Sequence, residues 1–232
     1  MYAKYLKRPM DLILSVFALI VLSPILLLLI LVGAIALKGN PFFTQPRPGK
    51  KNSDGNEIIF NLIKFRTMSN ERDENGELLP DEQRLGKYGA FLRSTSFDEF
   101  PSLINIALGH ISIVGPRPQL VRDMTFMTDE QRRRHLVRPG LTGLAQVNGR
   151  NNITWEQKFD YDLEYIDSGI TFWGDVKIIL QTVIKVLKRS DTVREGTVSD
   201  MDFVDWLMSE GKIDLETYNE NQDKARELLS VR

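Results

Sequence analysis

The sequence has 232 residues, with no cysteine and only two histidines, His110 and His135. Disulfide bonds, thiolate zinc sites and cysteine nucleophiles are therefore excluded. A histidine-rich metal cluster is excluded as well, so any bound metal should be a hard ion held by oxygen ligands. The formal net charge is −1, which argues against a generally basic nucleic-acid binder. We therefore expect no nucleic-acid partner.

The sequence also lacks the common glycine-rich phosphate motifs. Neither GxxxxGK[ST] nor GxGxxG occurs, so a P-loop or a Rossmann dinucleotide site is not supported. No internal repeat is visible. If the protein binds phosphate groups, it must do so with other side chains.

One long hydrophobic run is present, from Leu12 to Leu37. Roughly 26 helical residues would reach about 39 Å, more than the hydrocarbon core of a bilayer, which is about 30 Å thick. Pro24, after Ser23, removes a helix hydrogen bond near the middle of the run. Because positive charge tends to stay in the cytoplasm, basic flanks on both sides favour a re-entrant hairpin that enters and leaves by one face. These flanking residues are Lys4, Lys7, Arg8 and Lys38.

Other interpretations of this run remain open. A cleavable signal peptide fits poorly, because the run is too long and no small-residue cleavage site follows it. A plain spanning helix is the stronger alternative, since a kink costs little if Ser23 or water satisfies the freed carbonyl. Asp11 needs a partner at this depth, and we expect Lys7 and Arg8, about one turn away, to supply it.

The remaining sequence predicts an α+β fold, mostly helical, around a small sheet. Glu57–Arg66 is rich in β-favouring residues and predicts a strand, whereas Asn40–Gly55 and Gly109–Pro118 have the composition of loops and turns. The predicted helices are Phe97–Leu108, Asp129–Leu136, Trp155–Ile166 and Phe172–Arg189, with Ser69–Leu85 as an exposed loop or helix.

The helix predicted at Phe172–Arg189 is amphipathic. It could lie in the membrane interface or pack on the core of the domain, and the pattern does not decide between them. The acidic segment Asp200–Arg232 carries no motif; it is either an exposed helical tail or a contact for a partner or second subunit.

Two features point to chemistry. The first is the acid pair Asp98 and Glu99, which follows a Ser/Thr cluster. Taken alone, the pair is better explained as a helix cap, because Ser96 and Glu99 fit a capping box and acids favour helix N-termini.

The second feature is a recurrence of cations in Pro/Gly-rich contexts. A guanidinium group is a rigid planar donor that suits phosphate oxygens. Any one of these residues alone would be explained as solvated or ion-paired, but their repetition in loops indicates an anion site. They are Arg47, Lys64, Arg66, Arg117, Arg138 and Arg150.

Several long motifs resemble one known family, the bacterial monotopic phosphoglycosyl transferases. The motifs are KRPMD, LSP, FTQPRPG, IKFRTMSNERD, RSTSFDE, VGPRP, RPGLTGLAQVNGR and VLKRS, between about Lys4 and Gly196. The resemblance implies a re-entrant membrane helix over residues 1–39, broken at Ser23-Pro24, and a cytoplasmic catalytic domain over residues 40–196. Residues 197–232 form a tail to which it assigns no role.

The resemblance also implies a reaction. A sugar-1-phosphate would pass from a UDP-sugar to polyprenyl (undecaprenyl) phosphate, with release of UMP, as the first membrane step of glycan or glycoconjugate assembly. Asp98 would be the nucleophile, forming a covalent Asp-phosphosugar, and a Mg²⁺ ligand. Glu99 would bind Mg²⁺ or hold the geometry. The phosphate-binding candidates are Lys64, Arg93 and Arg117, with Arg138 and Arg150 lying in further family motifs.

The implied partners are a UDP-sugar donor, a polyprenyl phosphate acceptor and membrane lipid. The implied location is the cytoplasmic face of a bacterial inner membrane. Among donors we favour a UDP-N-acetyl-amino sugar by resemblance to the small members, and a homodimer is compatible with the sequence. The competing hypothesis is a membrane-tethered nucleotide-sugar or lipid-phosphate binding protein, or a scaffold, without turnover.

Overall fold

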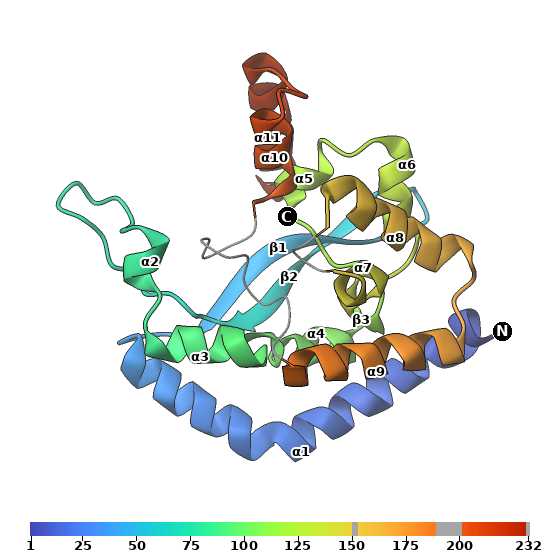
Figure 1. The fold of residues 1–232 in the computed structure, drawn as a ribbon, viewed down its shortest axis with the longest axis horizontal. Helices are drawn as coiled ribbons and strands as arrows, with labels where there is room; N and C mark the ends of the chain where they lie inside the picture. Colours follow the sequence, from blue (N-terminus) through green and yellow to red (C-terminus); the bar gives the residue numbers. More distant parts are fainter. Residues whose placement is uncertain (150–152, 189–200, 231–232) are drawn as a thin grey trace.

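The computed structural model describes residues 1–149, 153–188 and 201–230. It confirms an α+β, mostly helical fold with two small sheets (Figure 1). The strands are β1 (Phe42–Lys51), β2 (Glu57–Phe65), β3 (Ser112–Val114) and β4 (Gly140–Thr142). The helices are η1 (Tyr2–Leu6), α1 (Lys7–Ala36), α2 (Asp81–Arg84), α3 (Lys87–Thr95), η2 (Phe97–Glu99), α4 (Ser102–Leu108), α5 (Val121–Met124), α6 (Asp129–Arg132), η3 (Arg133–Leu136), α7 (Leu144–Val147), α8 (Trp155–Asp167), α9 (Phe172–Lys188), α10 (Phe203–Ser209) and α11 (Leu215–Ser230).

Helix α1 is long and apolar enough to cross a membrane by length and composition. It contains Pro24, and its axis bends near the middle (Figure 1). Proline has no N–H, so the carbonyl of Ile20 one turn earlier loses its usual partner. The Ser23 hydroxyl donates to that carbonyl at 2.8 Å. The predicted break is therefore a bend within one helix, with the freed carbonyl satisfied locally.

Both halves of α1 contact the same body of the protein. In the first half, Asp11 accepts hydrogen bonds from the Ser112 hydroxyl at 2.6 Å and from the Ile113 N–H at 3.2 Å. In the second half, the Leu29 carbonyl accepts from the Tyr88 hydroxyl at 2.9 Å. The rest of the described chain thus lies on one side of the bent helix (Figure 1).

The prediction that Lys7 and Arg8 are the hydrogen-bonding partners of Asp11 is wrong. Lys7 instead forms an ion pair with Asp175 at the start of α9. Arg8 donates to two carbonyl groups at the C-terminal end of α4. Residues one turn away on a helix need not point toward a buried carboxylate on that helix. Here Lys7 fixes α1 to α9, and Arg8 fixes α1 to α4.

Strands β1 and β2 form an antiparallel hairpin. The predicted strand Glu57–Arg66 is confirmed to within one residue at its end, but the prediction of a loop over Asn40–Gly55 is wrong, because β1 occupies most of it. β1 contains Pro46 and Pro48, which a strand tolerates when it has an unpaired edge. The Pro/Gly/Asn composition indicated a loop and concealed this pairing.

The other edge of β2 is covered by α4. The buried Asn105 side chain accepts from the Ile63 N–H at 2.9 Å and donates to the Asn61 carbonyl at 2.8 Å. The Ser102 hydroxyl donates to the Ile63 carbonyl at 2.8 Å. Two side chains thereby satisfy the backbone groups that a neighbouring strand would otherwise bind, and they fix α4 relative to β2.

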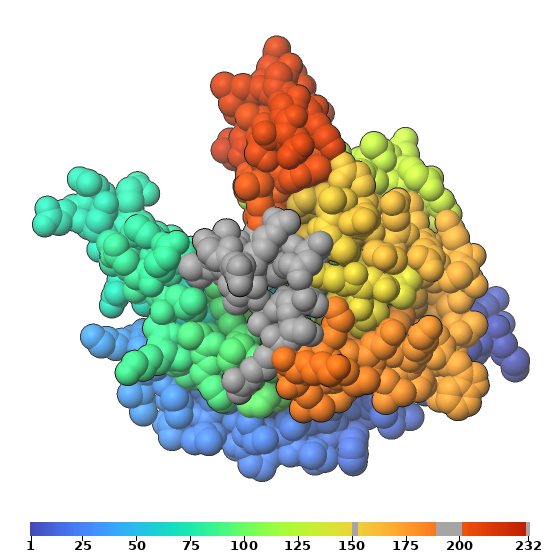
Figure 2. All heavy atoms as spheres, in the orientation of Figure 1, coloured from blue at the N-terminus to red at the C-terminus, as the bar shows by residue number. Residues whose placement is uncertain are grey.

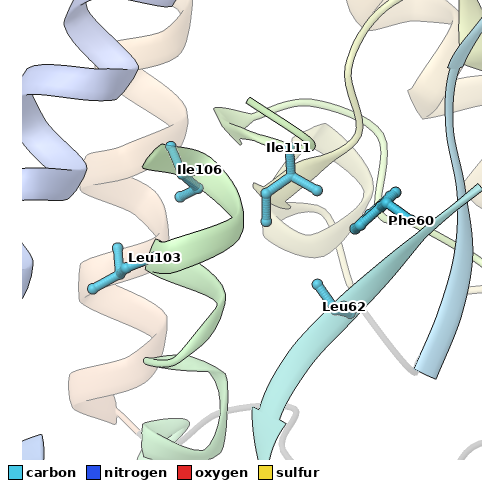
Figure 3. Packing of buried hydrophobic residues seen from close by; sticks show 5 residues of the cluster. All are labelled: Phe60, Leu62, Leu103, Ile106 and Ile111. Carbon is cyan, nitrogen blue, oxygen red and sulfur yellow. The ribbon is translucent and has the colours of Figure 1, made fainter. Parts of the chain in front are cut away.

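Hydrophobic packing joins the same two elements. Phe60 and Leu62 of β2 pack with Leu103 and Ile106 of α4, and Ile111 lies beside them (Figure 3). All five side chains are buried. This cluster makes the hairpin and α4 one rigid unit, from which the candidate site extends.

Strands β3 and β4 pair in parallel as a separate sheet. β3 lies inside Gly109–Pro118, which was predicted as a turn, and β4 lies in the RPGLTG motif, for which no strand was predicted. Glycine permits the close approach here: a Cβ atom added to Gly140 would lie 2.1 Å from the backbone nitrogen of Gly115. The glycines of the VGPRP and RPGLTG motifs thus bring two chain segments together.

The helices predicted at Trp155–Ile166 and Phe172–Arg189 are confirmed as α8 and α9, the latter as far as Lys188 within the described residues. Ile178 of α9 is buried against the body. The other side of α9 exposes a set of apolar side chains, so the helix both packs on the core and presents an apolar surface. These are Leu180, Val183, Ile184 and Leu187.

The C-terminal segment is helical. Phe203 and Val204 of α10 are buried, with Phe203 against Trp155 and Phe159 of α8. Helix α11 stands out from the body (Figure 2, red). The tail is therefore docked through α10 rather than wholly exposed.

Candidate active site

A cleft of about 510 Å³ lies among β1, β2, η2, the loop before α5, and α8. The acid pair and the three phosphate-binding candidates implied by resemblance at Lys64, Arg93 and Arg117 all line it; the acids are Asp98 and Glu99. They come from β2, α3, η2 and the VGPRP turn. The fold therefore brings together groups that span 54 positions of the chain, from 64 to 117.

The acid pair is presented by an irregular turn. Helix α3 ends at Ser96, which has the left-handed conformation with φ 58° and ψ 20°, and the short helix η2 follows at once. The Ser96 side chain makes no capping hydrogen bond to η2, so the predicted capping box is wrong. The turn directs Asp98 and Glu99 toward the cleft, and α4 anchors the turn to β2.

Glu99 is the centre of an ion-pair network. Its Oε1 atom accepts from Lys64 Nζ at 2.9 Å and from Arg117 Nη2 at 2.7 Å. Burial lowers the pKa of Lys64, and the Glu99 charge opposes that shift. One carboxylate thus holds two cations from separate elements at the wall of the cleft.

Asp98 lies near two of the cations. Burial lowers the pKa of Arg93, and the Asp98 charge opposes that shift. The Asp98 charge also opposes the lowering of the Lys64 pKa. The Nε atom of Arg93 donates to the Thr67 hydroxyl at 3.0 Å, which orients the guanidinium. A carboxylate beside fixed cations suits the binding of an anionic group at the same place.

Arg47 also lines the cleft, although the sequence had given it only as one of several loop cations. Its Nη1 donates to the Pro118 carbonyl at 3.2 Å, and its Nη2 donates to Gln45. Burial, with the nearby Arg117 charge, lowers the pKa of Arg47 to about 10. Its Nε has no partner among the described residues. The QPRPG motif was the signal, but nothing local showed that it lay in a strand facing this cleft.

Comparison with known proteins identifies the family of this chain. The family described as bacterial sugar transferase matches residues 2–189.

The chain belongs to this family.

Among curated relatives, the uncharacterised sugar transferase EpsL of Bacillus subtilis is 47% identical over 182 residues, covering 78% of this chain and 87% of that protein. The UDP-glucose:undecaprenyl-phosphate glucose-1-phosphate transferase of Klebsiella pneumoniae is 40% identical, over 77% of this chain and 39% of the relative. The undecaprenyl-phosphate galactose phosphotransferase of Salmonella typhimurium is 31% identical, over 81% and 41%. The chain thus spans most of EpsL but about two-fifths of the other two. The expected family and the expectation of a transferase enzyme are confirmed.

One predicted phosphate-binding residue of the transferase, Arg138, lies elsewhere in the described structure. Arg138 does not line the cleft among the described residues; its Nε donates to the Gly109 carbonyl at the end of α4, at 2.8 Å. Burial and the adjacent Arg8 lower the pKa of Arg138. This arginine ties the chain before β4 to the C-terminal end of α4. Arg150 lies outside the described residues.

A buried ion pair supports the Arg117 side of the cleft. Arg134 and Asp162 are 1% and 3% exposed, with Nη2 and Oδ2 at 2.6 Å. The same Nη2 donates to the Arg117 carbonyl at 2.6 Å, so α8 holds the VGPRP turn in place. Burial raises the pKa of Asp162 to about 6. No local pattern in the sequence indicates this long-range pair.

The number of carboxylates in the acid pair is compatible with a bound magnesium ion. Among the described residues, no three or more His, Asp or Glu side chains form a group that could hold a metal. Mg²⁺ is nevertheless often bound by one or two carboxylates together with substrate phosphates. Asp98 and Glu99, which both line the cleft, are the candidate ligands in the transferase.

Proposed function

We propose that this transferase moves a sugar-1-phosphate from a UDP-sugar to polyprenyl phosphate and releases UMP. The observation that carries the proposal is Asp98 in a cleft beside Lys64, Arg93 and Arg117. The names of the Klebsiella and Salmonella relatives, which state undecaprenyl phosphate as acceptor, support it.

In the first step, an Asp98 carboxylate oxygen attacks the phosphorus that carries the sugar. A new P–O bond to Asp98 forms, the P–O bond to the UMP phosphate breaks, and UMP leaves as an anion. A carboxylate nucleophile of this kind divides one difficult transfer into two easier ones. The product is an acyl phosphate in which Asp98 carries the sugar-phosphoryl group.

In the second step, a phosphate oxygen of the polyprenyl phosphate attacks the same phosphorus. The bond to Asp98 breaks, which restores the carboxylate, and a polyprenyl-diphosphate sugar is formed. Phosphoryl transfer depends on positioning and charge stabilisation. The cations Lys64, Arg93, Arg117 and Arg47 are the groups that provide it.

The cations also lower the repulsion between anions. A nucleotide-sugar diphosphate and a lipid phosphate would repel each other, and both would repel Asp98. Glu99 prevents the opposite problem, since it keeps Lys64 and Arg117 in place when no substrate is bound. If Mg²⁺ binds, Asp98 and Glu99 would hold it, and it would supply positive charge that screens the phosphate groups.

An apolar groove supports the choice of a lipid acceptor. A second cavity of about 320 Å³ shares Glu99 and Arg117 with the cleft and runs to α9. Its lining is mainly apolar and includes Phe100, Val147 and Val186. A phosphate at Arg117 could therefore place its attached prenyl chain in this groove.

The position of α1 supports a membrane-surface location. The bent helix has both halves against the same body, so we propose that it enters and leaves one face of the bacterial inner membrane, with the cleft on the cytoplasmic side. Exposed apolar residues on neighbouring helices, including Phe91 of α3, Leu108 of α4 and Leu187 of α9, would lie at the same surface. The acceptor headgroup would then meet Asp98 without leaving the bilayer.

Turnover tests the proposal. Purified protein in detergent, with Mg²⁺, undecaprenyl phosphate and a panel of radiolabelled UDP-sugars, should release UMP with at least one donor. Asp98→Asn should lower kcat by about 10³-fold or more, as loss of a nucleophile does elsewhere. Asp160→Asn, which removes an exposed carboxylate of α8, should retain activity.

The covalent step has its own test. Without acceptor, wild-type protein should retain sugar label in a form that hydroxylamine removes, as expected for an acyl phosphate, and Asp98→Asn should retain none. Binding of UDP-sugar without UMP release from any donor would support the binding-protein or scaffold alternative. Full activity of Asp98→Asn would rule out the mechanism.

A further inference from the structure

Part of the cleft wall comes from outside the region that the family profile matches. The match ends at residue 189, but Met201 and Asp202 also line the cleft. They directly precede α10, whose Phe203 and Val204 are buried at 3% and 0% exposure. Met201 and Asp202 are therefore held in place by the packing of α10.

Asp202 belongs to an acidic group at the cleft. Its Oδ2 accepts from Arg122 Nη2 at 2.7 Å. Close by, Asp123 accepts from the Val204 N–H at 3.3 Å, and burial together with the Asp202 charge raises the pKa of Asp123 to about 6. Two carboxylates thus converge where α5 meets α10.

The cleft lining carries charges of both signs. It includes the cations Lys64, Arg93 and Arg117 and the carboxylate of Asp202, whereas Asp123 is buried behind Asp202. Charges of both signs act on Arg47. The Arg117 charge contributes to the lowering of the Arg47 pKa, whereas the Asp123 and Asp202 charges oppose it. A ligand with an anionic part and a neutral polar part fits this lining.

Asp202 has capacity for such a ligand. A carboxylate has about four acceptor sites, and the Asp202 side chain is 43% exposed although Arg122 engages it. It would repel a diphosphate but accepts readily from hydroxyl groups. The hydroxyl-bearing parts of a nucleotide-sugar are its ribose and its sugar.

We infer that Asp202 is a specificity residue that accepts hydrogen bonds from donor hydroxyl groups, and that α10 holds it in place for that purpose. This inference rests on the proposed function, because it takes a nucleotide-sugar as the donor. The inference gives the C-terminal segment a role in recognition of the donor substrate.

The chain offers a matched control in Asp205. Asp205 also accepts from Arg122 Nη2 at 2.7 Å, and its side chain is 44% exposed, but it is not among the residues that line the cleft. Asp202→Asn and Asp205→Asn therefore remove equivalent contacts to Arg122. A purely structural role predicts equal effects from the two substitutions.

The experiment measures the binding of UMP and of several UDP-sugars by calorimetry, in an Asp98→Asn background so that no turnover occurs, together with the thermal unfolding midpoint. Asp202→Asn should weaken donor binding about 10-fold, and Asp205→Asn less than twofold, with equal changes in the midpoint. Weakening of UMP along with every donor assigns the ribose; weakening of UDP-sugars alone assigns the sugar.

Two results would count against separate claims. If the Asp202→Asn and Asp205→Asn proteins bind every ligand alike, Asp202 is only structural and the inference fails, whatever the proposed function. If the protein with native Asp202 binds no nucleotide-sugar while remaining folded, the proposed function fails first, and the inference fails with it.

Discussion

Glu99 joins residues that lie 35 and 18 positions away in the chain, Lys64 and Arg117. Replacement by glutamine removes the charge that holds both cations while keeping the shape of the side chain. We expect Glu99→Gln to lower kcat/KM about 10- to 100-fold, or about 1.4 to 2.8 kcal/mol of transition-state stabilisation. Steady-state UMP release measures it.

The matched control is Glu156→Gln on α8. Glu156 pairs with Lys212 at 2.6 Å, but its side chain is 51% exposed, and an exposed pair of this kind contributes little. It should therefore leave kcat/KM within twofold. If Glu99→Gln keeps more than half of the wild-type rate, the ion-pair network is not needed for turnover.

His135 predicts a pH dependence of stability. Burial lowers the pKa of His135 to about 4. Burial alone would raise the pKa of its partner Glu57, but hydrogen bonds from His135 and Arg132 lower it to about 2. Both values lie below those of the unfolded chain, about 6.5 and 4.5, so the unfolded chain binds more protons in acid.

The free energy of unfolding should therefore be highest above about pH 6.5 and fall as the pH is lowered toward 4. At about 1.36 kcal/mol per pH unit, His135 contributes about 3 kcal/mol over this range. Thermal unfolding in detergent between pH 8 and pH 4 measures it, and His135→Gln should flatten the upper part of the curve. A wild-type midpoint that does not change down to pH 4.5 would contradict the burial of a neutral imidazole.

Helix α4 depends on polar contacts as much as on apolar packing. Asn105→Leu keeps the approximate volume but leaves the Ile63 N–H and the Asn61 carbonyl without their partner in a buried place. Each unsatisfied group costs about 1–3 kcal/mol, so we expect about 2–5 kcal/mol of lost stability. Turnover should fall as well, because α4 anchors the turn that carries Asp98.

Ile106→Val, on the same helix and also buried, is the comparison variant. It removes one methylene group and should cost about 1 kcal/mol with little change in turnover. Urea unfolding of both variants separates the two kinds of contact. Equal losses would mean that hydrophobic packing alone positions α4.

At the scale of elements, the sequence predicted what is periodic and local. Helices α8 and α9 followed from apolar residues at helical spacing, and β2 from its run of β-favouring residues. β1 was missed because Pro46, Pro48 and Gly49 indicate a loop, and only pairing with β2 makes this segment a strand. The prediction of a capping box at Ser96 was wrong for a related reason: Glu99 forms ion pairs with cations that are distant in the chain, which no local pattern indicates.

The same limit applies to the candidate site. Lys64, Arg93, Asp98, Glu99 and Arg117 could be singled out by resemblance, and the fold places all of them at one cleft. Asp202 could not, because it lies past the matched motifs and enters the cleft only through the packing of α10 on α8. Position in a shared cavity is a property of tertiary contacts, which sequence spacing does not contain.

At the scale of the whole molecule, the bend in α1 and the placement of the body belong together. A straight helix of 30 residues would be about 45 Å long and, if it crossed the bilayer, would carry one end away from the body. Instead Asp11 and Leu29, one in each half, bind groups of the same body. The body would have to enter the hydrocarbon to keep both contacts around a spanning helix, and that would bury its polar surface in lipid.

This argument predicts the sides of the membrane on which the two ends of α1 lie. The chain has no cysteine, so single cysteines report position directly. Ala3→Cys and Gly39→Cys are exposed sites before and after the apolar run, and Ser53→Cys in the β1–β2 turn marks the body. In spheroplasts of a bacterial expression host, an impermeant maleimide should label none of the three. In inverted vesicles it should label all three, and labelling of either end from outside while Ser53→Cys stays protected would mean that α1 spans the bilayer.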